Sequence, residues 1–198
     1  EAAGAQNLLT APTMRALDRY TGTLYGALHG RGLKGTPTEN NSLTPDEVAR
    51  AKSTVLIQSA MFGLIPATDL IPEYKINATK NLNGLSLKRL WSEAHEAIWP
   101  RLAGGIIIDL RSNTYADLAP IPEGLTFYRV MVYVEREDGS REQLNHFNKK
   151  AKGQLVRAAL VAANAPQTIR DLQKCAAKAG LKVEVSDSLL TLVTRSAT

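Results

Sequence analysis

Apolar residues recur at three- and four-residue intervals in several parts of the chain, and each such part predicts an amphipathic helix. The first stripe runs through residues 12–29, but Gly22 lies in its middle and predicts a break there. Further helices are predicted over residues 85–102, 148–163 and 168–179. Thr44 and Pro45 predict another helix start, because threonine is favoured as the N-cap and proline at the first helical position.

Shorter apolar runs bounded by turn-forming residues predict strands, over residues 54–59, 106–110, 125–135, 181–185 and 189–194. The run 106–110 is apolar on consecutive positions, which predicts a central strand covered on both faces. Glycines and prolines punctuate residues 63–72, which predicts an irregular segment. Helices and strands are mixed without strict alternation, so we expect an α+β fold with a mixed sheet and packed helices.

We expect one compact domain over residues 1–198, with a flexible internal loop at residues 30–43, where glycine and polar residues show no periodicity. The composition agrees with a folded core, because 44% of the residues are hydrophobic and 22% are charged. No apolar run approaches the roughly 20 residues that span a bilayer, so no membrane partner is expected. Cys175 is the only cysteine, which excludes an internal disulfide and favours a reducing compartment.

The charge of the chain indicates a class of binding partner. Lysine and arginine number 24 against 19 acidic residues, so the formal net charge is +5 and a polyanion is a candidate partner. The excess is concentrated at the predicted helix from Asn148, whose first turn holds Lys149 and Lys150, with Lys152 just beyond. Residues 143–170 contain no acidic residue. Because a helix N-terminus already carries partial positive charge, lysines there are unfavourable unless an anion binds.

A helical projection places Lys149, Lys150, Gly153 and Arg157 on one arc, opposite an apolar arc. We therefore expect this basic arc to be exposed as a unit, with Gly153 letting a phosphate approach the backbone. An equally weighted interpretation is a solvated basic face that pairs with acidic residues elsewhere in the fold.

Polar residues also follow the predicted strand 106–110. Loops at the carboxyl ends of strands are frequent ligand sites in sheet proteins with helical layers, which makes this segment a pocket candidate. Arg111 can bind a carboxylate or phosphate with two hydrogen bonds. The alternative is an ordinary strand-to-helix turn. The candidates in this segment are Asp109, Arg111, Ser112, Asn113 and Tyr115.

A third candidate segment follows the predicted strand 54–59 and includes Ser59, Asp69, Tyr74 and Lys75. Its length is unusual for a simple connection, and long ordered loops are often functional. Asp69 with Lys75 can also be a structural ion pair. The chain has no nucleotide-binding glycine fingerprint and no metal-ligand spacing, so we expect neither a cofactor nor a metal site.

Residues 20–25, 59–72, 109–115 and 148–153 together resemble the YaaA family of bacterial peroxide stress proteins, in order and spacing over nearly the whole chain. The resemblance implies a cytoplasmic α+β protein of the peroxide stress response, linked to limiting free intracellular iron and to DNA binding through a basic cleft. Lys75 and Lys152 stand where the family usually has arginine. The apolar strand and loop with which family members open are not found before residue 12, so we expect the domain to be N-terminally incomplete.

The leading hypothesis is a protein that binds double-stranded DNA, or another phosphate-bearing polyanion, in a basic cleft. Its phosphate-binding residues would be Lys149, Lys150, Lys152, Gly153, Arg157, Lys75 and Arg111. The alternative is an enzyme that acts on a small phosphorylated or nucleobase-containing molecule in the same cleft, and no catalytic residue is assigned. Its pocket candidates are Ser59, Asp69, Tyr74, Asp109, Ser112, Asn113, Tyr115 and Asn148.

Overall fold

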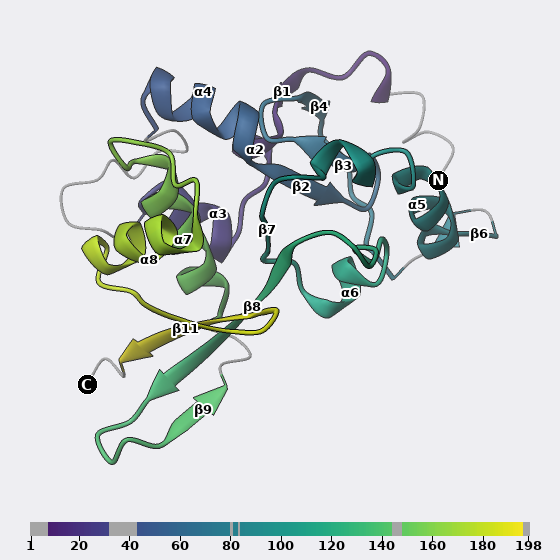
Figure 1. The fold of residues 1–198 in the computed structure, drawn as a ribbon. Helices are drawn as coiled ribbons and strands as arrows, with labels where there is room; N and C mark the ends of the chain where they lie inside the picture. Colours follow the sequence, from purple (N-terminus) through teal and green to yellow (C-terminus); the bar gives the residue numbers. More distant parts are fainter. Residues whose placement is uncertain (1–7, 32–42, 80, 83, 144–147, 196–198) are drawn as a thin grey trace. The chain divides into compact units, whose positions relative to one another are not determined.

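The computed structural model describes residues 8–31, 43–79, 81–82, 84–143 and 148–195, and its helices and strands are intermixed as an α+β fold (Figure 1). Most of the predicted flexible loop 30–43 lies outside these residues. Two compact units emerge from the contacts. Unit 1 comprises Glu1–Tyr20, Ala51–Gly105 and Arg111–Leu125, and unit 2 comprises Thr21–Arg50, Ile106–Leu110 and Thr126–Thr198. The single domain over residues 1–198 stays a prediction.

Unit 2 is built on a mixed sheet in the order β10-β11-β8-β7, with β9 paired to β8. The long strand β8 (Phe127–Glu135) pairs in parallel with β11 (Leu189–Arg195) and with β7 (Ile107–Asp109). Antiparallel pairs join β10 (Lys182–Ser186) to β11, and β9 (Arg141–Gln143) to β8. The predicted strands 181–185 and 189–194 are confirmed as the hairpin of β10 and β11, and Gly139, in the turn between β8 and β9, has a positive φ of 79° that suits glycine.

The central position predicted for residues 106–110 is wrong. β7 lies at the end of the strand order, and Ile107 and Ile108 are only half-buried. A run of three isoleucines fits an edge strand as well as a central one. Hydrophobic side chains indicate that neighbouring elements cover the strand, but they do not indicate that it pairs with another strand on each side.

Two helices cover the apolar face of this sheet, α7 (Asn148–Leu160) and α8 (Ile169–Lys178) (Figure 1). The core joins alternate residues of β8 and β11, such as Val130 and Leu190, to Leu155 of α7 and Leu172 of α8. The predicted helix start at 168 is confirmed, because Thr168 and Asp171 form a reciprocal capping box. A shorter helix, α3 (Thr23–Leu28), packs along α7.

The helix start at Thr44 is also confirmed. α4 (Pro45–Thr54) begins directly after it, the Thr44 N–H donates to Glu47 Oε2, and the Glu47 N–H donates to Thr44 Oγ1.

Unit 1 consists of short elements connected by turns. Three antiparallel pairs are formed: β1 (Thr13–Arg15) with β4 (Leu70–Pro72), β2 (Leu56–Ser59) with β3 (Gly63–Pro66), and β5 (Asn81–Leu82) with β6 (Leu85–Ser86). Its helices are α2 (Ala16–Arg19), α5 (Leu87–His95), the 3-10 turn η1 (Trp99–Leu102) and α6 (Asn113–Ala116). Its core cluster contains Ala60, Ala78, Leu87 and Leu118.

Three sequence predictions need correction in this part of the chain. Residues 63–72 are not irregular, because they supply β3 and β4. The predicted helix 12–29 is the strand β1 followed by α2 and α3, with the break at Gly22 confirmed by its φ of 125°. The predicted helix 85–102 is divided into β6, α5 and η1. Pro100 accounts for the break between α5 and η1, because it cannot donate the backbone hydrogen bond that a continuous helix needs.

Candidate nucleic-acid interface

The first turn of α7 presents two lysines to solvent. Lys149 and Lys150 are exposed, and this turn contains no acidic residue. Neither lysine forms an ion pair with a residue that the structure describes. Their charges add to the partial positive charge of the helix N-terminus, so an anion bound there would be stabilised by all three sources.

The expectation that the basic arc of α7 is exposed as a unit is wrong. Gly153 is buried under α3, and a Cβ added to it would lie 2.1 Å from the Leu24 carbonyl oxygen. Arg157 is half-buried and donates to the Leu28 carbonyl oxygen over 3.1 Å. The glycine therefore admits a neighbouring helix rather than a phosphate, and only the first turn of the arc remains open.

Lys152 lies on the buried side of α7, in contact with the end of β7. Only 7% of it is exposed, and its Nζ donates to the Leu110 carbonyl oxygen over 3.0 Å. Burial, with a smaller contribution from nearby Arg129, lowers the pKa of Lys152 to about 8, and Asp109 opposes both effects. Asp109 is itself buried and accepts from Arg129 NH1 at 2.6 Å. Asp109 and Lys152, both predicted as site residues, are thus neighbours within unit 2, in a buried cluster.

A second group of predicted residues meets in unit 1, around the hydroxyl of Tyr74. Its oxygen lies 2.7 Å from Ser59 Oγ and 2.5 Å from the Tyr20 hydroxyl. Ser59 Oγ also accepts from the N–H groups of Met61 and Phe62 at 3.0 Å. Burial, and secondarily the neighbouring Tyr74, raise the pKa of Tyr115. The Ser59 hydroxyl orders the turn after β2, and the enzyme alternative stays a prediction.

Arg111 is held by protein groups of unit 1. Its NH1 donates to Gln58 Oε1 at 3.3 Å and to the Ala119 carbonyl oxygen at 2.8 Å, and the guanidinium lies 6.0 Å from the centre of the Trp99 ring. These contacts use donor capacity that Arg111 would need to bind a carboxylate or phosphate.

The remaining candidates lie at the surface or at helix starts. Lys75 and Asp69 are exposed. Ser112 is the N-cap residue of α6, which agrees with the strand-to-helix turn, although its side chain makes no capping hydrogen bond. Asn113 and Asn148 are the first residues of α6 and α7.

Two residues that complete these clusters were not among the predicted site residues. Arg129 interrupts the apolar alternation of β8, and a charged residue inside such a strand is the signal that could have identified a buried ion pair. Tyr20 had no comparable signal, because its contact with Tyr74 spans 54 positions in sequence.

Neither a metal-binding cluster nor a helix that could span a membrane is found among the residues with a described structure. No group of three or more histidine, cysteine or acidic side chains among them is arranged to hold a metal ion. None of the helices found there combines the length and apolar character needed to cross a membrane.

Comparison with known proteins gives consistent matches along the chain. The family model described as peroxide stress protein YaaA matches residues 1–186. A UPF0246 protein of Corynebacterium glutamicum is 35% identical over 202 residues, which cover 98% of this chain and 75% of the relative. A UPF0246 protein of Streptomyces coelicolor is 33% identical over 186 residues, covering 93% of this chain and 67% of the relative.

Proposed function

This chain belongs to the family of the peroxide stress protein YaaA, and from that premise we propose that it binds double-stranded DNA through the backbone phosphates. DNA binding would be the physical activity through which this chain serves the peroxide stress role of its family. Phosphate contacts carry most of the affinity of proteins that bind DNA without sequence preference.

The observation that carries the proposal is the exposed first turn of α7. Lys149 and Lys150 stand there without acidic neighbours in the turn, at the end of the helix where positive charge is least favourable. A DNA phosphate would relieve this repulsion and would release condensed counterions on binding. Lys152 contributes less, because its ammonium group is buried and donates to the Leu110 carbonyl oxygen.

The test is the affinity of the chain for fluorescently labelled duplex DNA, measured by anisotropy at low salt. The double substitution Lys149→Gln and Lys150→Gln should weaken binding about tenfold for all DNA sequences alike, because phosphate contacts are not sequence-specific.

The control substitutes Lys174 and Lys178, two exposed lysines of α8, by glutamine. It removes the same charge from the same unit, so it should cost much less affinity. Equal losses in both double variants would show that only net charge matters, and absence of DNA binding by the unaltered chain would overturn the proposal.

A further inference from the structure

A small pocket lies beside the first turn of α7, and its lining is basic. Its volume is about 280 Å³, and it is lined by Gly22, Thr23, Gly26, Ala27, Arg31 and Lys150. Among the described residues, the lining thus includes two cations and no acidic residue. All of them belong to unit 2, with α3 forming one wall and the start of α7 another.

Arg31 is placed at this pocket by the way α3 ends. Gly30 has a φ of 79°, its N–H donates to the Ala27 carbonyl oxygen, and the Arg31 N–H donates to the Gly26 carbonyl oxygen. This is a Schellman motif, which fixes the backbone of the residue after the glycine. The Arg31 side chain then folds back over Gly26, where an added Cβ would lie 3.5 Å from Arg31 Nε.

Two of the three nitrogens of the Arg31 guanidinium have no hydrogen-bond partner among the described residues. Its Nε and NH2 atoms are shielded from solvent and donate to no group that the structure describes. Buried donors without acceptors are costly and call for an explanation such as a bound ion. A rotation of the flexible side chain would turn these donors toward a ligand in the pocket. Lys150, the exposed lining residue contributed by α7, forms no ion pair with a described residue.

The volume and the charge indicate which ligand fits. About 280 Å³ lies below the range of roughly 300–1,000 Å³ typical of pockets for whole drug-sized molecules, so one chemical group suits it better than a complete nucleotide. A phosphomonoester carries about −1.5 to −2 charges near neutral pH, which matches two cations, and its oxygens suit the planar fork of arginine.

We propose that this pocket binds a terminal phosphate group, a phosphomonoester, with Arg31 as its principal ligand and Lys150 as the second cation. The inference rests on the proposed function where it uses Lys150, and it adds Arg31 and the chemistry of the bound group. Inorganic phosphate, a nucleoside monophosphate and the 5′-phosphorylated end of a DNA duplex all present this group.

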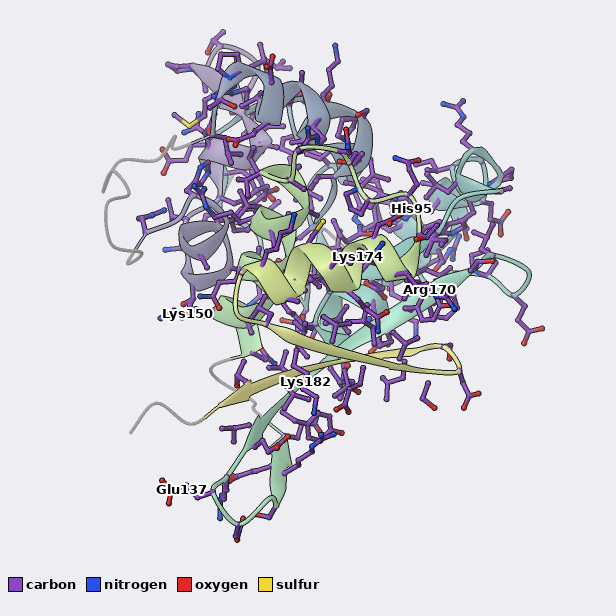
Figure 2. All side chains as sticks on the ribbon, turned by 60° about the vertical axis from the view of Figure 1, so that its left-hand side comes forward. His95, Glu137, Lys150, Arg170, Lys174 and Lys182 are labelled. Atoms are coloured by element: carbon purple, nitrogen blue, oxygen red, sulfur yellow. The ribbon has the colours of Figure 1, made fainter. Side chains whose placement is uncertain are left out.

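The experiment follows the Nε–Hε signal of Arg31 and the amide signals of Gly22 and Gly26 by NMR while inorganic phosphate is added to the full chain. We expect saturable shifts, and Arg31→Met should weaken phosphate binding about tenfold or more, since charge-assisted hydrogen bonds are lost. Arg170→Met is the matched control, because Arg170 is exposed on α8 and lies well apart from Lys150 in Figure 2.

Two more variants keep the test decisive if Arg31→Met fails to fold. Lys150→Gln alters an exposed residue and should also weaken phosphate binding, and Arg31→Lys keeps the charge but should not restore full affinity. Binding that is unchanged in both variants would overturn the proposal.

Duplex DNA with and without a 5′-phosphate separates this inference from the proposed function. Tighter binding of the phosphorylated duplex, lost in Arg31→Met, supports the pocket on DNA. Saturable binding of phosphate without any binding of DNA supports the pocket and overturns DNA binding. Salt-dependent DNA binding with no response to phosphate or to the 5′-phosphate overturns the pocket and leaves DNA binding intact.

Discussion

The four basic residues of α7 illustrate how strongly the environment of a side chain decides its role. Lys149 and Lys150 are solvated, whereas Lys152 is buried and Arg157 is half-buried and donates to the carbonyl end of α3. All four have the same formal charge, but the two with backbone carbonyl partners bind the protein itself. Solvated lysines are the ones available for a polyanion.

Lys152 gives the stability of the fold a defined pH dependence. Its pKa is lowered from 10.5 to about 8 by burial, so between these values the unfolded chain holds a proton that the folded chain has released. Stability therefore rises as the pH rises through this window, by about 2 kcal/mol after allowance for solvent screening. Urea unfolding of the unaltered chain across the window should show this rise.

Lys152→Met should remove this rise of stability with pH, because the variant lacks the lysine whose titration causes it. Lys149→Met is the matched control, since Lys149 is exposed on the same helix, and it should retain the rise. Parallel stability profiles for the unaltered chain and Lys152→Met would contradict the assignment to this lysine.

At the scale of elements, the packing of α3 on α7 depends on one missing side chain. Gly153 lets the backbone of α3 approach so closely that an added Cβ would lie 2.1 Å from a carbonyl oxygen and 2.9 Å from Ala27 Cβ. The sequence showed a glycine inside a helix, which is unfavourable by about 1 kcal/mol relative to alanine. Only the packed helix explains why alanine does not fit.

Gly153→Ala should therefore destabilise the protein by about 2 kcal/mol or more, because the backbones of α3 and α7 must move apart to admit the methyl group. The better helix propensity of alanine does not offset this cost. Gly26→Ala is the matched control. A Cβ added to Gly26 would meet only the flexible side chain of Arg31, at 3.5 Å. The stability of the Gly26→Ala variant should therefore equal that of the unaltered chain or be slightly higher. Thermal unfolding of both variants measures the contrast, and equal melting temperatures would refute the close approach.

Helices and strands could be predicted from the sequence where the local signals were strong. The capping residues Thr44 and Thr168 marked helix starts correctly, because a cap acts within three residues. The strands β3 and β4 were missed, because each consists of at most four residues and pairs with a partner that local periodicity does not reveal. For β1 and β4 that partner is more than 50 positions away.

At the scale of the whole molecule, the net charge of +5 favours any polyanion, and the response to salt measures how many cations contact phosphates. The logarithm of the DNA affinity should fall linearly with the logarithm of the salt concentration. Replacing Lys149 and Lys150 by glutamine should make this slope shallower by about 2, because each phosphate contact contributes roughly 0.9. The Lys174 and Lys178 double variant should keep the original slope, and an unchanged slope in both variants would place the phosphate contacts elsewhere.

The sequence by itself determined the family, the α+β class, the well-capped helices and the basic start of α7, because these depend on residue order, periodicity and local charge. Tertiary structure alone decided which basic residues remain open to a ligand. Gly153 meets α3, Lys152 meets the end of β7, and Arg31 is folded back over Gly26. Burial and hydrogen-bond pairing arise between segments far apart in the chain, so no local pattern of residues can specify them.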